Sequence, residues 1–325
     1  MMTYDAVAIG EFLIDFTPGG TSPAGNPLFE RNAGGAPVNV LAALARLGKR
    51  TAFIGKVGND PFGHFLQDTL RQEGIDDKGL VFTDHAHTTM AFVHLGEGGE
   101  RSFHFCRQPG ADEALAFEEI DASLLGGARV FHFGSVSMTS EPSRGATLAA
   151  VREAKARGAW ITYDPNWRPA LWQDNQHAKQ AMEEGLKEAD VVKVSEEELF
   201  FLTGADGLEA GAQLLMERFP VKLLLVTLGA EGSYYRTRTA EGRAASYPVA
   251  PVDTTAAGDG FMGAFIYALL ENDRPVPEWT DGELRQALAF ANAGGALATT
   301  RRGAIASLAD HGEIEKLVKG EPIPD

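Results

Sequence analysis

The chain has 325 residues, 44% of them hydrophobic, which is enough for one large α/β domain with its own core. Its 45 acidic and 29 basic side chains give a formal net charge of −16, which argues against nucleic acid and anionic membrane as general partners. The single cysteine, Cys106, excludes an intrachain disulfide and a cysteine-rich metal site. Because there is also no basic signal region and no apolar run of roughly 18 residues, the sequence predicts a cytoplasmic protein.

Short apolar runs alternate with helical patterns along most of the chain. Apolar runs of this kind are typical of buried parallel strands, and they cover Val7–Phe16, Thr51–Val57, Val130–Phe133, Trp160–Tyr163, Val191–Val194 and Leu223–Leu228. Several segments with helical periodicity begin with proline or an N-cap residue, and several end with glycine. Helices are predicted over Pro37–Leu47, Asp60–Glu73, Ser140–Arg157, Asp174–Lys187, Leu208–Arg218, Gly258–Leu270 and Asp281–Thr300. This alternation predicts an α/β fold with a doubly wound, mostly parallel sheet flanked by helices.

Two segments do not fit this alternation. Gly19–Pro27 is rich in Gly, Pro and Ser and is predicted to form a turn region inside the first crossover. Met90–Leu95 and Arg101–Arg107 have the composition of strands, and with the connection Gly96–Glu100 they predict a β-hairpin. Because an antiparallel hairpin needs a surface to cover its apolar face, we expect a small β lid, built from about residues 17–33 and 88–110, within a single domain spanning residues 1–325.

The segment from Asp253 to Asp259, Asp-Thr-Thr-Ala-Ala-Gly-Asp, directly precedes an apolar run of helical length. Small residues allow the backbone to approach a ligand, and the start of a helix presents unpaired N–H groups and partial positive charge, so the segment predicts a binding site for an anion such as phosphate. A carboxylate at Asp259 would repel that anion unless it serves as a base for an attacking hydroxyl. The alternative is an ordinary helix N-terminus with an aspartate in its first turn.

Polar residues also follow several of the predicted strands, where ligands gather in an open α/β sheet. These residues are Asp15, Asp164, Asn166, Arg168, Ser195, Glu196–Glu198, Thr227 and Gly229. Each one alone could be a turn residue or a helix cap, but their joint placement indicates a ligand edge. A second glycine-rich segment, Asn32–Asn39, offers close backbone approach at Gly34-Gly35 and an amide at Asn39 that suits a polyol. A flexible entry to the following helix is the alternative for that segment.

The segments Gly34–Asn39 and Asp253–Asp259 resemble the two signatures of the ribokinase-like carbohydrate kinases, the PfkB family. The resemblance extends from about Ala6 to Ala306, and it favours the fructokinase branch through Glu100–Arg107, Pro109–Asp112, Phe131–Ser135, Tyr163–Arg168, Leu171-Trp172 and Val192–Leu199. It implies a ribokinase-like fold and ATP-dependent phosphorylation of a sugar's primary hydroxyl, most directly D-fructose to fructose 6-phosphate.

The resemblance also implies roles for individual residues. It makes Asp259 the catalytic base and places the anion hole at Ala256, Ala257, Gly258 and the Asp259 N–H. Residues matching sugar-contacting positions are Asp15, Gly34, Gly35 and Asn39, with Phe105, Arg107 and Arg168 completing the pocket. Residues matching nucleotide-contacting positions are Thr227, Gly229, Gly258 and Asn292. Two positions depart from the family pattern: Ala256 stands where many members have Gly, and Ser195 stands where the broader motif has Asn.

Two cations and a lid contact are implied in the same way. Glu198 matches a position that holds Mg²⁺ through water, and a K⁺ site beside the anion hole is matched by Asp253, Thr255, Arg301, Gly303 and Ser307. In related kinases the lid often forms a dimer surface, so a homodimer through the lid is expected. The expected ligands are therefore a sugar and ATP, with Mg²⁺ and K⁺, and with no nucleic acid and no membrane.

Two other functions remain open at this stage. Arg107 and Arg168 could pair with a carboxylate, which keeps 2-keto-3-deoxygluconate as an alternative substrate. A non-catalytic sugar or nucleotide sensor on the same fold would be expected to lose the base or the anion hole, and this chain keeps both. A nicotinamide-dependent enzyme would need Gly-x-Gly-x-x-Gly after the first strand, and that pattern is absent there.

Overall fold

The computed structural model describes residues 4–95, 101–272 and 274–322. Among these residues, nine strands form one large sheet in the order β13 (Glu241–Ala244), β12 (Ser233–Arg236), β11 (Leu223–Thr227), β10 (Val191–Ser195), β9 (Trp160–Tyr163), β8 (Ala128–Phe133), β1 (Tyr4–Ile9), β4 (Thr51–Gly58) and β5 (Asp76–Thr83). Neighbours are parallel from β11 to β5, whereas β12 and β13 add an antiparallel edge. The prediction of a mostly parallel α/β sheet is confirmed.

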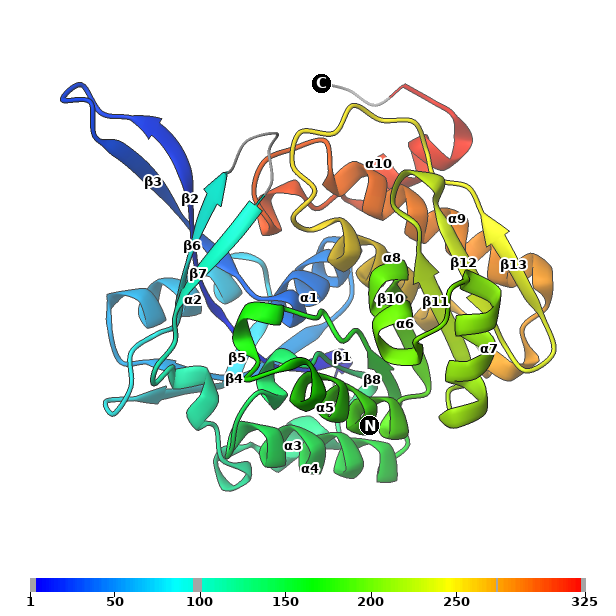
Figure 1. Ribbon diagram of the computed structural model, residues 1–325, viewed down its shortest axis with the longest axis horizontal. Helices are drawn as coiled ribbons and strands as arrows, with labels where there is room; N and C mark the ends of the chain where they lie inside the picture. Colours follow the sequence, from blue (N-terminus) through cyan, green and yellow to red (C-terminus); the bar gives the residue numbers. More distant parts are fainter. Residues whose placement is uncertain (1–3, 96–100, 273, 323–325) are drawn as a thin grey trace.

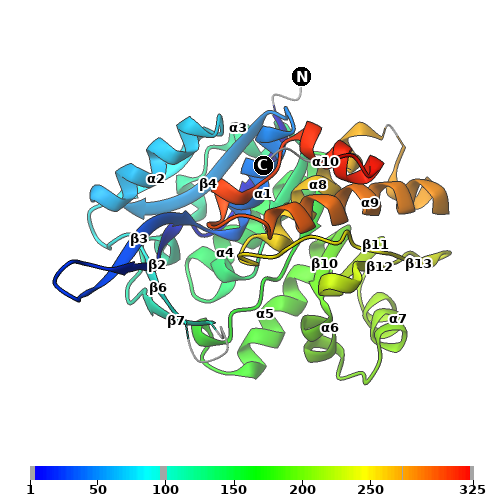
Figure 2. The same ribbon diagram turned by 90° about the horizontal axis from the view of Figure 1, so that it is seen from above.

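Helices cover both faces of the large sheet (Figures 1 and 2). One face packs against α1 (Ala36–Arg46), α2 (Pro61–Gln72), α8 (Ala257–Glu271), α9 (Asp281–Ala298) and α10 (His311–Lys319). The other packs against α3 (Ala122–Leu125), α4 (Ser143–Ala156), α5 (Asn175–Glu188), α6 (Glu196–Thr203) and α7 (Leu208–Arg218). Alternate residues of β1 enter the two cores, Ala6 and Ala8 on one side and Val7 and Ile9 on the other. Burial on both faces explains why the strands are continuous apolar runs.

The prediction of a single strand over Val7–Phe16 is wrong. The strand β1 ends at Ile9, and the chain then leaves the large sheet and begins β2 (Leu13–Thr21) in a second sheet. The chain is packed tightly where it turns, because a Cβ atom on Gly10 would lie 2.5 Å from Pro37 Cγ at the start of α1. Glu11 lies in the break between the strands and is buried there. A charged residue in the middle of an apolar run was the available sign of this break.

The second sheet has the order β3 (Pro27–Gly34), β2, β6 (Met90–Leu95) and β7 (Arg101–Cys106) among the described residues. The predicted antiparallel pairing of β6 with β7 is confirmed, while their connection Gly96–Glu100 lies outside the described residues. The prediction of a turn over Gly19–Pro27 is wrong at both ends, because β2 continues to Thr21 and β3 begins at Pro27. Figure 1 shows this sheet extending outward from one side of the molecule. None of the described helices has both the length and the apolar character needed to cross a membrane.

Candidate active site

Three adjoining cavities surround the first turn of α8. A cavity of about 570 Å³ is lined by residues that include Thr227, Gly258 and Asn292. A polar cavity of about 310 Å³ shares Thr227 and Gly258 with it and adds Lys193 and Asp259. A small cavity of about 70 Å³ shares Asp259 with the second and is lined further by Asp15, Asn39, Phe105 and Arg168. The cavities therefore meet at Gly258 and Asp259.

The first turn of α8 offers backbone donors at this meeting point. The first hydrogen bond of the helix ladder runs from the Gly260 N–H to the Ala256 carbonyl at 2.8 Å. The N–H groups of Gly258 and Asp259 precede this bond, so no carbonyl one turn earlier in the helix engages them. Ala256 has a φ of −103°, which an alanine adopts without strain, so the departure from Gly at this position leaves the backbone geometry intact. The turn is therefore suited to hold an anionic oxygen.

Asp259 is buried at the N-terminus of α8, with 5% of the residue exposed. Its Oδ2 atom accepts a hydrogen bond of 2.7 Å from Asn39 Nδ2, and Asn166 Nδ2 donates to Oδ1 at 3.4 Å. Burial raises its pKa to about 6, against the lowering effects of the Asn39 hydrogen bond and of the cations Lys193 and Arg168. A carboxylate with this pKa is ionised at neutral pH and can still take up a proton, which is the property of a general base.

Asn166 is the one non-glycine residue with a positive φ, 52°, in the described part of the chain. It follows β9 in a loop, and it lines both the polar cavity and the small cavity, the two that contain Asp259. Left-handed backbone at a residue other than glycine is uncommon and collects at functional sites, where the surroundings hold it in place. Here the conformation places the Asn166 amide against the proposed base.

Lys193 is a charged residue of the site that was not predicted from the sequence, because it lies within an apolar strand pattern. It lies within the apolar run of β10, its ammonium donates to Asp164 Oδ2 at 2.8 Å, and its side chain is 9% exposed. A Cβ atom placed on Gly258 would lie 2.8 Å from Lys193 Nζ, so the ammonium stands directly beside the first turn of α8. Burial alone would lower the pKa of Lys193, but the carboxylates of Asp164, Glu198 and Asp259 outweigh it and raise that pKa. Lysine is rarely buried unless it is paired, and this lysine also lines the polar cavity.

The small cavity brings together most of the residues expected to contact sugar. Asp15 faces it from β2, and burial raises the pKa of Asp15 to about 6, with Arg168 opposing and Asp259 adding to the rise. Gly34 packs against Asp15, because an added Cβ would lie 2.0 Å from Asp15 Oδ2. Gly35 has a φ of 134° and leaves room for the Glu11 carbonyl, which would be 2.5 Å from an added Cβ. A side chain at Gly34 would therefore displace the Asp15 carboxylate, and one at Gly35 would collide with backbone.

Two of the expected sugar contacts, Gly34 and Arg107, lie outside the residues that line the small cavity. Gly34 packs against Asp15, whereas the Arg107 guanidinium donates to Asp112 Oδ2 at 2.7 and 2.9 Å. Phe105, two residues earlier, does line the cavity, as does Glu11. Glu11 was not expected there, because the sequence suggested an uninterrupted strand.

Substituting Gly34 by alanine should weaken acceptor binding. The new Cβ would displace the Asp15 carboxylate, since the two cannot lie 2.0 Å apart. We expect the KM for the sugar to rise about tenfold or more while the KM for ATP stays within about twofold, since misplacing one charge-assisted hydrogen bond costs about 1.5–3 kcal/mol. Steady-state kinetics with each substrate varied in turn check this. An unchanged sugar KM in a folded variant would place Asp15 outside the acceptor site.

The large cavity receives residues from three elements. Thr227 ends β11, Gly229 follows with a φ of +59°, and Asn292 projects from α9. The Asn292 amide donates to the carbonyls of Ala244 and Ala245 at 3.0 and 3.2 Å, which fixes the wall of the cavity next to β13. A volume of about 570 Å³ lies within the range of small-molecule and cofactor sites.

Glu198 and Asp253 are both held by backbone N–H groups. The two Glu198 oxygens accept from Trp167 and Ser195, each at 2.7 Å, and Ser195 Oγ accepts from the Glu198 N–H at 3.1 Å. Ser195 therefore completes a capping box of α6 in place of the family's asparagine. The Asp253 carboxylate accepts from the Thr255 N–H at 2.9 Å and from the Gly303 N–H at 3.2 Å.

The other two residues expected at a K⁺ site make contacts of their own. The Arg301 guanidinium pairs with Glu313, and Ser307 Oγ donates to the Ala304 carbonyl at 2.9 Å. The Arg301 and Ser307 side chains are thus engaged locally, which leaves their backbone carbonyls as the groups to consider for a cation.

Comparison with known proteins agrees with this geometry. Residues 4–311 match the pfkB family carbohydrate kinases. The chain is 45% identical to Fructokinase-1 of Oryza sativa subsp. japonica over 315 residues, 96% of this chain and 97% of the relative. A fructokinase from Xylella fastidiosa with bound ATP superposes with a TM-score of 0.90 at 37% identity, covering 97% of this chain and 98% of that one. A fructokinase from Vibrio cholerae O395 in a fructose-, ADP- and calcium-bound form gives 0.88 at 37% identity, covering 97% and 99%.

Proposed function

Because this chain belongs to the pfkB family of carbohydrate kinases, we propose that it transfers the γ-phosphoryl group of ATP to the primary hydroxyl of D-fructose, forming fructose 6-phosphate. The observation that carries the proposal is the meeting of the three cavities at Gly258 and Asp259. The large cavity suits the nucleoside and the polar cavity suits its phosphates, while the small cavity offers carboxylates and amides that could bind the hydroxyl groups of a monosaccharide. The base and the backbone N–H groups lie where the two substrates would react.

The chemistry follows from these positions. Asp259 takes the proton of the attacking hydroxyl, so that the oxygen attacks the γ-phosphorus as the bond to ADP breaks. The N–H groups of the first turn of α8 hold the equatorial oxygens of the transferring group, and Lys193 adds a positive charge next to them. Asn39 and Asn166 orient the base. A non-catalytic sensor would not need a buried carboxylate at this point. An ionised carboxylate repels the phosphate, and burying it costs stability.

The charge of the small cavity favours a neutral sugar over a keto acid. Glu11, Asp15 and Asp259 line it, and Arg168 is the one cationic side chain among its described lining residues. Arg107, the second cation that could have received a carboxylate, is neutralised by Asp112. An acidic substrate would meet more negative than positive charge here, and such like-charge contact costs several kcal/mol.

Direct competition between the two acceptors tests the substrate. We expect kcat/KM for D-fructose to exceed that for 2-keto-3-deoxygluconate by about 10²-fold or more, as the charge imbalance requires. A coupled assay of ADP release with each acceptor alone, followed by product analysis of a mixture, gives this ratio. A preference for the keto acid would contradict the proposal, because it would mean that Arg168 outweighs the three carboxylates of the cavity.

We also propose that Mg²⁺ binds in the polar cavity, where the side chains offer suitable oxygen atoms. Mg²⁺ keeps several waters and is usually held by one or two carboxylates together with substrate phosphates. Glu197 and Glu198 line the polar cavity, and the two anchored oxygens of Glu198 fit a role as acceptors for metal-bound water. When bound with ATP, the ion supplies neutralisation of phosphate charge.

We also propose that K⁺ binds next to Asp253. The carboxylate there gathers Thr255 and Gly303 beside the first turn of α8, and backbone carbonyls of this loop and of Arg301 and Ser307 would be its further ligands. Replacing K⁺ by tetramethylammonium at constant ionic strength should lower kcat. Equal kcat values in the two salts would show that the enzyme does not use K⁺.

A homodimer through the second sheet (β3, β2, β6 and β7), here called the lid sheet, and a cytoplasmic location complete the proposal. The lid sheet carries Leu28 and Phe29 with 46% and 39% of their surface exposed, and Phe29 contacts Phe92 edge-on. Exposed apolar side chains on a projecting sheet suit a second copy of the chain. Sedimentation equilibrium of the chain and of a Leu28→Glu variant tests the dimer. The cytoplasm supplies ATP and keeps Cys106 reduced.

The pH dependence of kcat/KM should report the base. Burial raises the pKa of Asp259 to about 6, so the ionised, active form is lost as the pH falls through that value. We expect kcat/KM for the sugar to be constant above about pH 7 and to fall about tenfold per unit below about pH 6. Asp15 titrates in the same range, so the Asp15→Asn variant should keep an acid limb if Asp259 causes it. A profile of the wild type that is flat down to pH 5 would contradict the assignment.

A further inference from the structure

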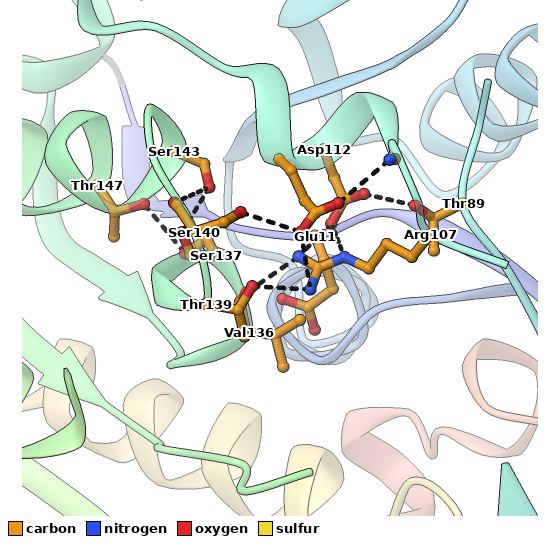
Figure 3. A network of polar contacts seen from close by, with 12 residues as sticks. Glu11, Thr89, Arg107, Asp112, Val136, Ser137, Thr139, Ser140, Ser143 and Thr147 are labelled. Atoms are coloured by element: carbon orange, nitrogen blue, oxygen red, sulfur yellow. Dashed lines mark hydrogen bonds and ion pairs between the residues drawn. The ribbon is translucent and has the colours of Figure 1, made fainter. Parts of the chain in front are cut away.

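Arg107 closes the end of the lid sheet, and a buried polar cluster surrounds it. It directly follows β7, and its side chain is 5% exposed. Its Nε and Nη2 atoms donate to Asp112 Oδ2, its Nη1 donates to Thr139 Oγ1 at 2.8 Å, and Nη2 also reaches the Val136 carbonyl at 3.1 Å. Figure 3 shows the guanidinium with Asp112 on one side and Thr139 and Val136 on the other. The side chain thus ties the end of the lid to two loops of the main body.

The same cluster reaches the base of β6 and the start of α1. Asp112 Oδ1 accepts from Thr89 Oγ1 at 2.5 Å, directly before β6. Glu11 lies close enough that Arg107 lowers the pKa of its carboxyl, which burial raises to about 7. One Glu11 oxygen accepts from the Ala36 N–H at 3.0 Å, and the other has no hydrogen-bond partner among the described residues. Gly110 sits within the cluster, where an added Cβ would lie 2.3 Å from Thr89 Oγ1 and 2.7 Å from Arg107 Cγ. The packing leaves no room for rearrangement.

The segments that Arg107 joins also supply walls of the small cavity. Phe105 belongs to the same strand end, and Val136 is the residue whose carbonyl accepts from Arg107. The guanidinium itself lies outside the cavity lining. From this arrangement we propose that Arg107 is a positioning residue for acceptor binding: it holds the lid-borne Phe105 and the Val136 loop at the distance that shapes the sugar cavity. This inference rests on the proposed function, because it takes that cavity as the sugar site.

The geometry calls for arginine and not simply for a positive charge. Arg107 uses three nitrogens on three acceptors that lie around the plane of one guanidinium. A lysine would keep the pair with Asp112 but has a single nitrogen and no planar fork, so it cannot also hold Thr139 and Val136 in the same positions. Replacing Arg107 by lysine should therefore change the shape of the cavity while the charge of the cluster stays the same.

Four variants separate this role from a general structural one. Arg107→Lys and Thr139→Val each remove contacts that fix the cavity wall, while Thr139→Ser keeps the hydroxyl that accepts from Arg107. Arg46→Lys is the control, because the partly buried Arg46, like Arg107, bridges a carboxylate (Glu73) and a carbonyl but lines none of the three cavities. For each folded variant, the KM for the acceptor, the KM for ATP and kcat are measured, with thermal unfolding as the check on folding. The acceptor is the sugar with the highest wild-type kcat/KM in a panel of neutral hexoses and pentoses.

We expect Arg107→Lys and Thr139→Val to raise the acceptor KM about 5- to 20-fold with the ATP KM within about twofold, the size expected for one or two lost hydrogen bonds. Thr139→Ser and Arg46→Lys should stay near wild type. An unchanged acceptor KM in folded Arg107→Lys, or an equal rise of both KM values, would overturn the inference. If Arg107→Lys does not fold, the Thr139 pair decides. Poor wild-type activity with fructose but good activity with another sugar would count against the proposed substrate and leave this test intact.

Discussion

Replacing Asp259 by asparagine is expected to lower kcat by about 10²–10⁴, the usual loss when a positioned general base is removed. Asparagine keeps the volume of the side chain and an oxygen for the Asn39 amide, but it cannot take the proton of the sugar hydroxyl. The KM values should change much less than kcat, because the backbone N–H groups and the cavities remain. Single-turnover rates with saturating sugar and ATP give the chemical step directly. Near-normal turnover by the variant would remove Asp259 from the role of base.

Stability provides the control for this variant, and its sign follows from the raised pKa. A carboxyl whose pKa rises from 3.8 to about 6 on folding binds more protons in the folded state between those values. Folding stability is therefore lost as the pH rises through this window, and the ionised Asp259 costs stability at pH 7. The asparagine side chain does not titrate, so Asp259→Asn should unfold at an equal or higher temperature than wild type at pH 7, with the difference growing from pH 4 to pH 7. A variant less stable than wild type at pH 7 would contradict the raised pKa of Asp259.

Replacing Lys193 by methionine is expected to lower kcat by about 10²–10³, as for the loss of one preorganised donor to a developing anion. The ammonium stands beside Gly258, where the transferring phosphoryl group would lie, and methionine keeps the length of the side chain without its charge. Because the change strands the Asp164 carboxylate, the double variant Lys193→Met/Asp164→Asn is needed as well. We expect the double variant to recover stability but not turnover.

The matched control for Lys193 is Lys56→Met. Lys56 is also a strand lysine with a 9% exposed side chain, and it pairs with Glu119 at 2.6 Å away from the three cavities. Lys56→Met should lose stability with little change in kcat. A full recovery of kcat in the Lys193/Asp164 double variant would assign Lys193 a role in folding alone.

The large sheet could be predicted because its strands are buried on both faces and read as apolar runs. Two features escaped that logic. The break between β1 and β2 follows from the tight packing of Gly10 against Pro37 of α1 and of Gly35 against Glu11 and Phe12, which are tertiary contacts with no local periodicity. The edge strands β5, β12 and β13 were also missed: β5 and β13 are only partly buried, and β12 is buried but has only four residues, so none has the long apolar run of a central strand.

The candidate site divides in a similar way. Asp259, Asn39 and Asp15 come together in the structure, and they could be found because glycine-rich segments and strand ends mark ligand edges. Lys193 was hidden within a strand, and its role depends on the approach of α8 to β10. Arg107 is the opposite case. An arginine is a residue type that suits a ligand, but here its guanidinium is paired with Asp112, five residues later in the chain. The sequence alone could not show which acceptor the guanidinium meets.

A crystal structure with fructose and a non-hydrolysable ATP analogue would show the reacting groups side by side. We expect the primary hydroxyl of the sugar within about 3.2 Å of an Asp259 carboxylate oxygen, the reach of a general base. We also expect the terminal phosphate of the analogue against the first turn of α8, with Lys193 Nζ in contact. A sugar bound with its primary hydroxyl turned away from Asp259, or a terminal phosphate held elsewhere, would contradict the account.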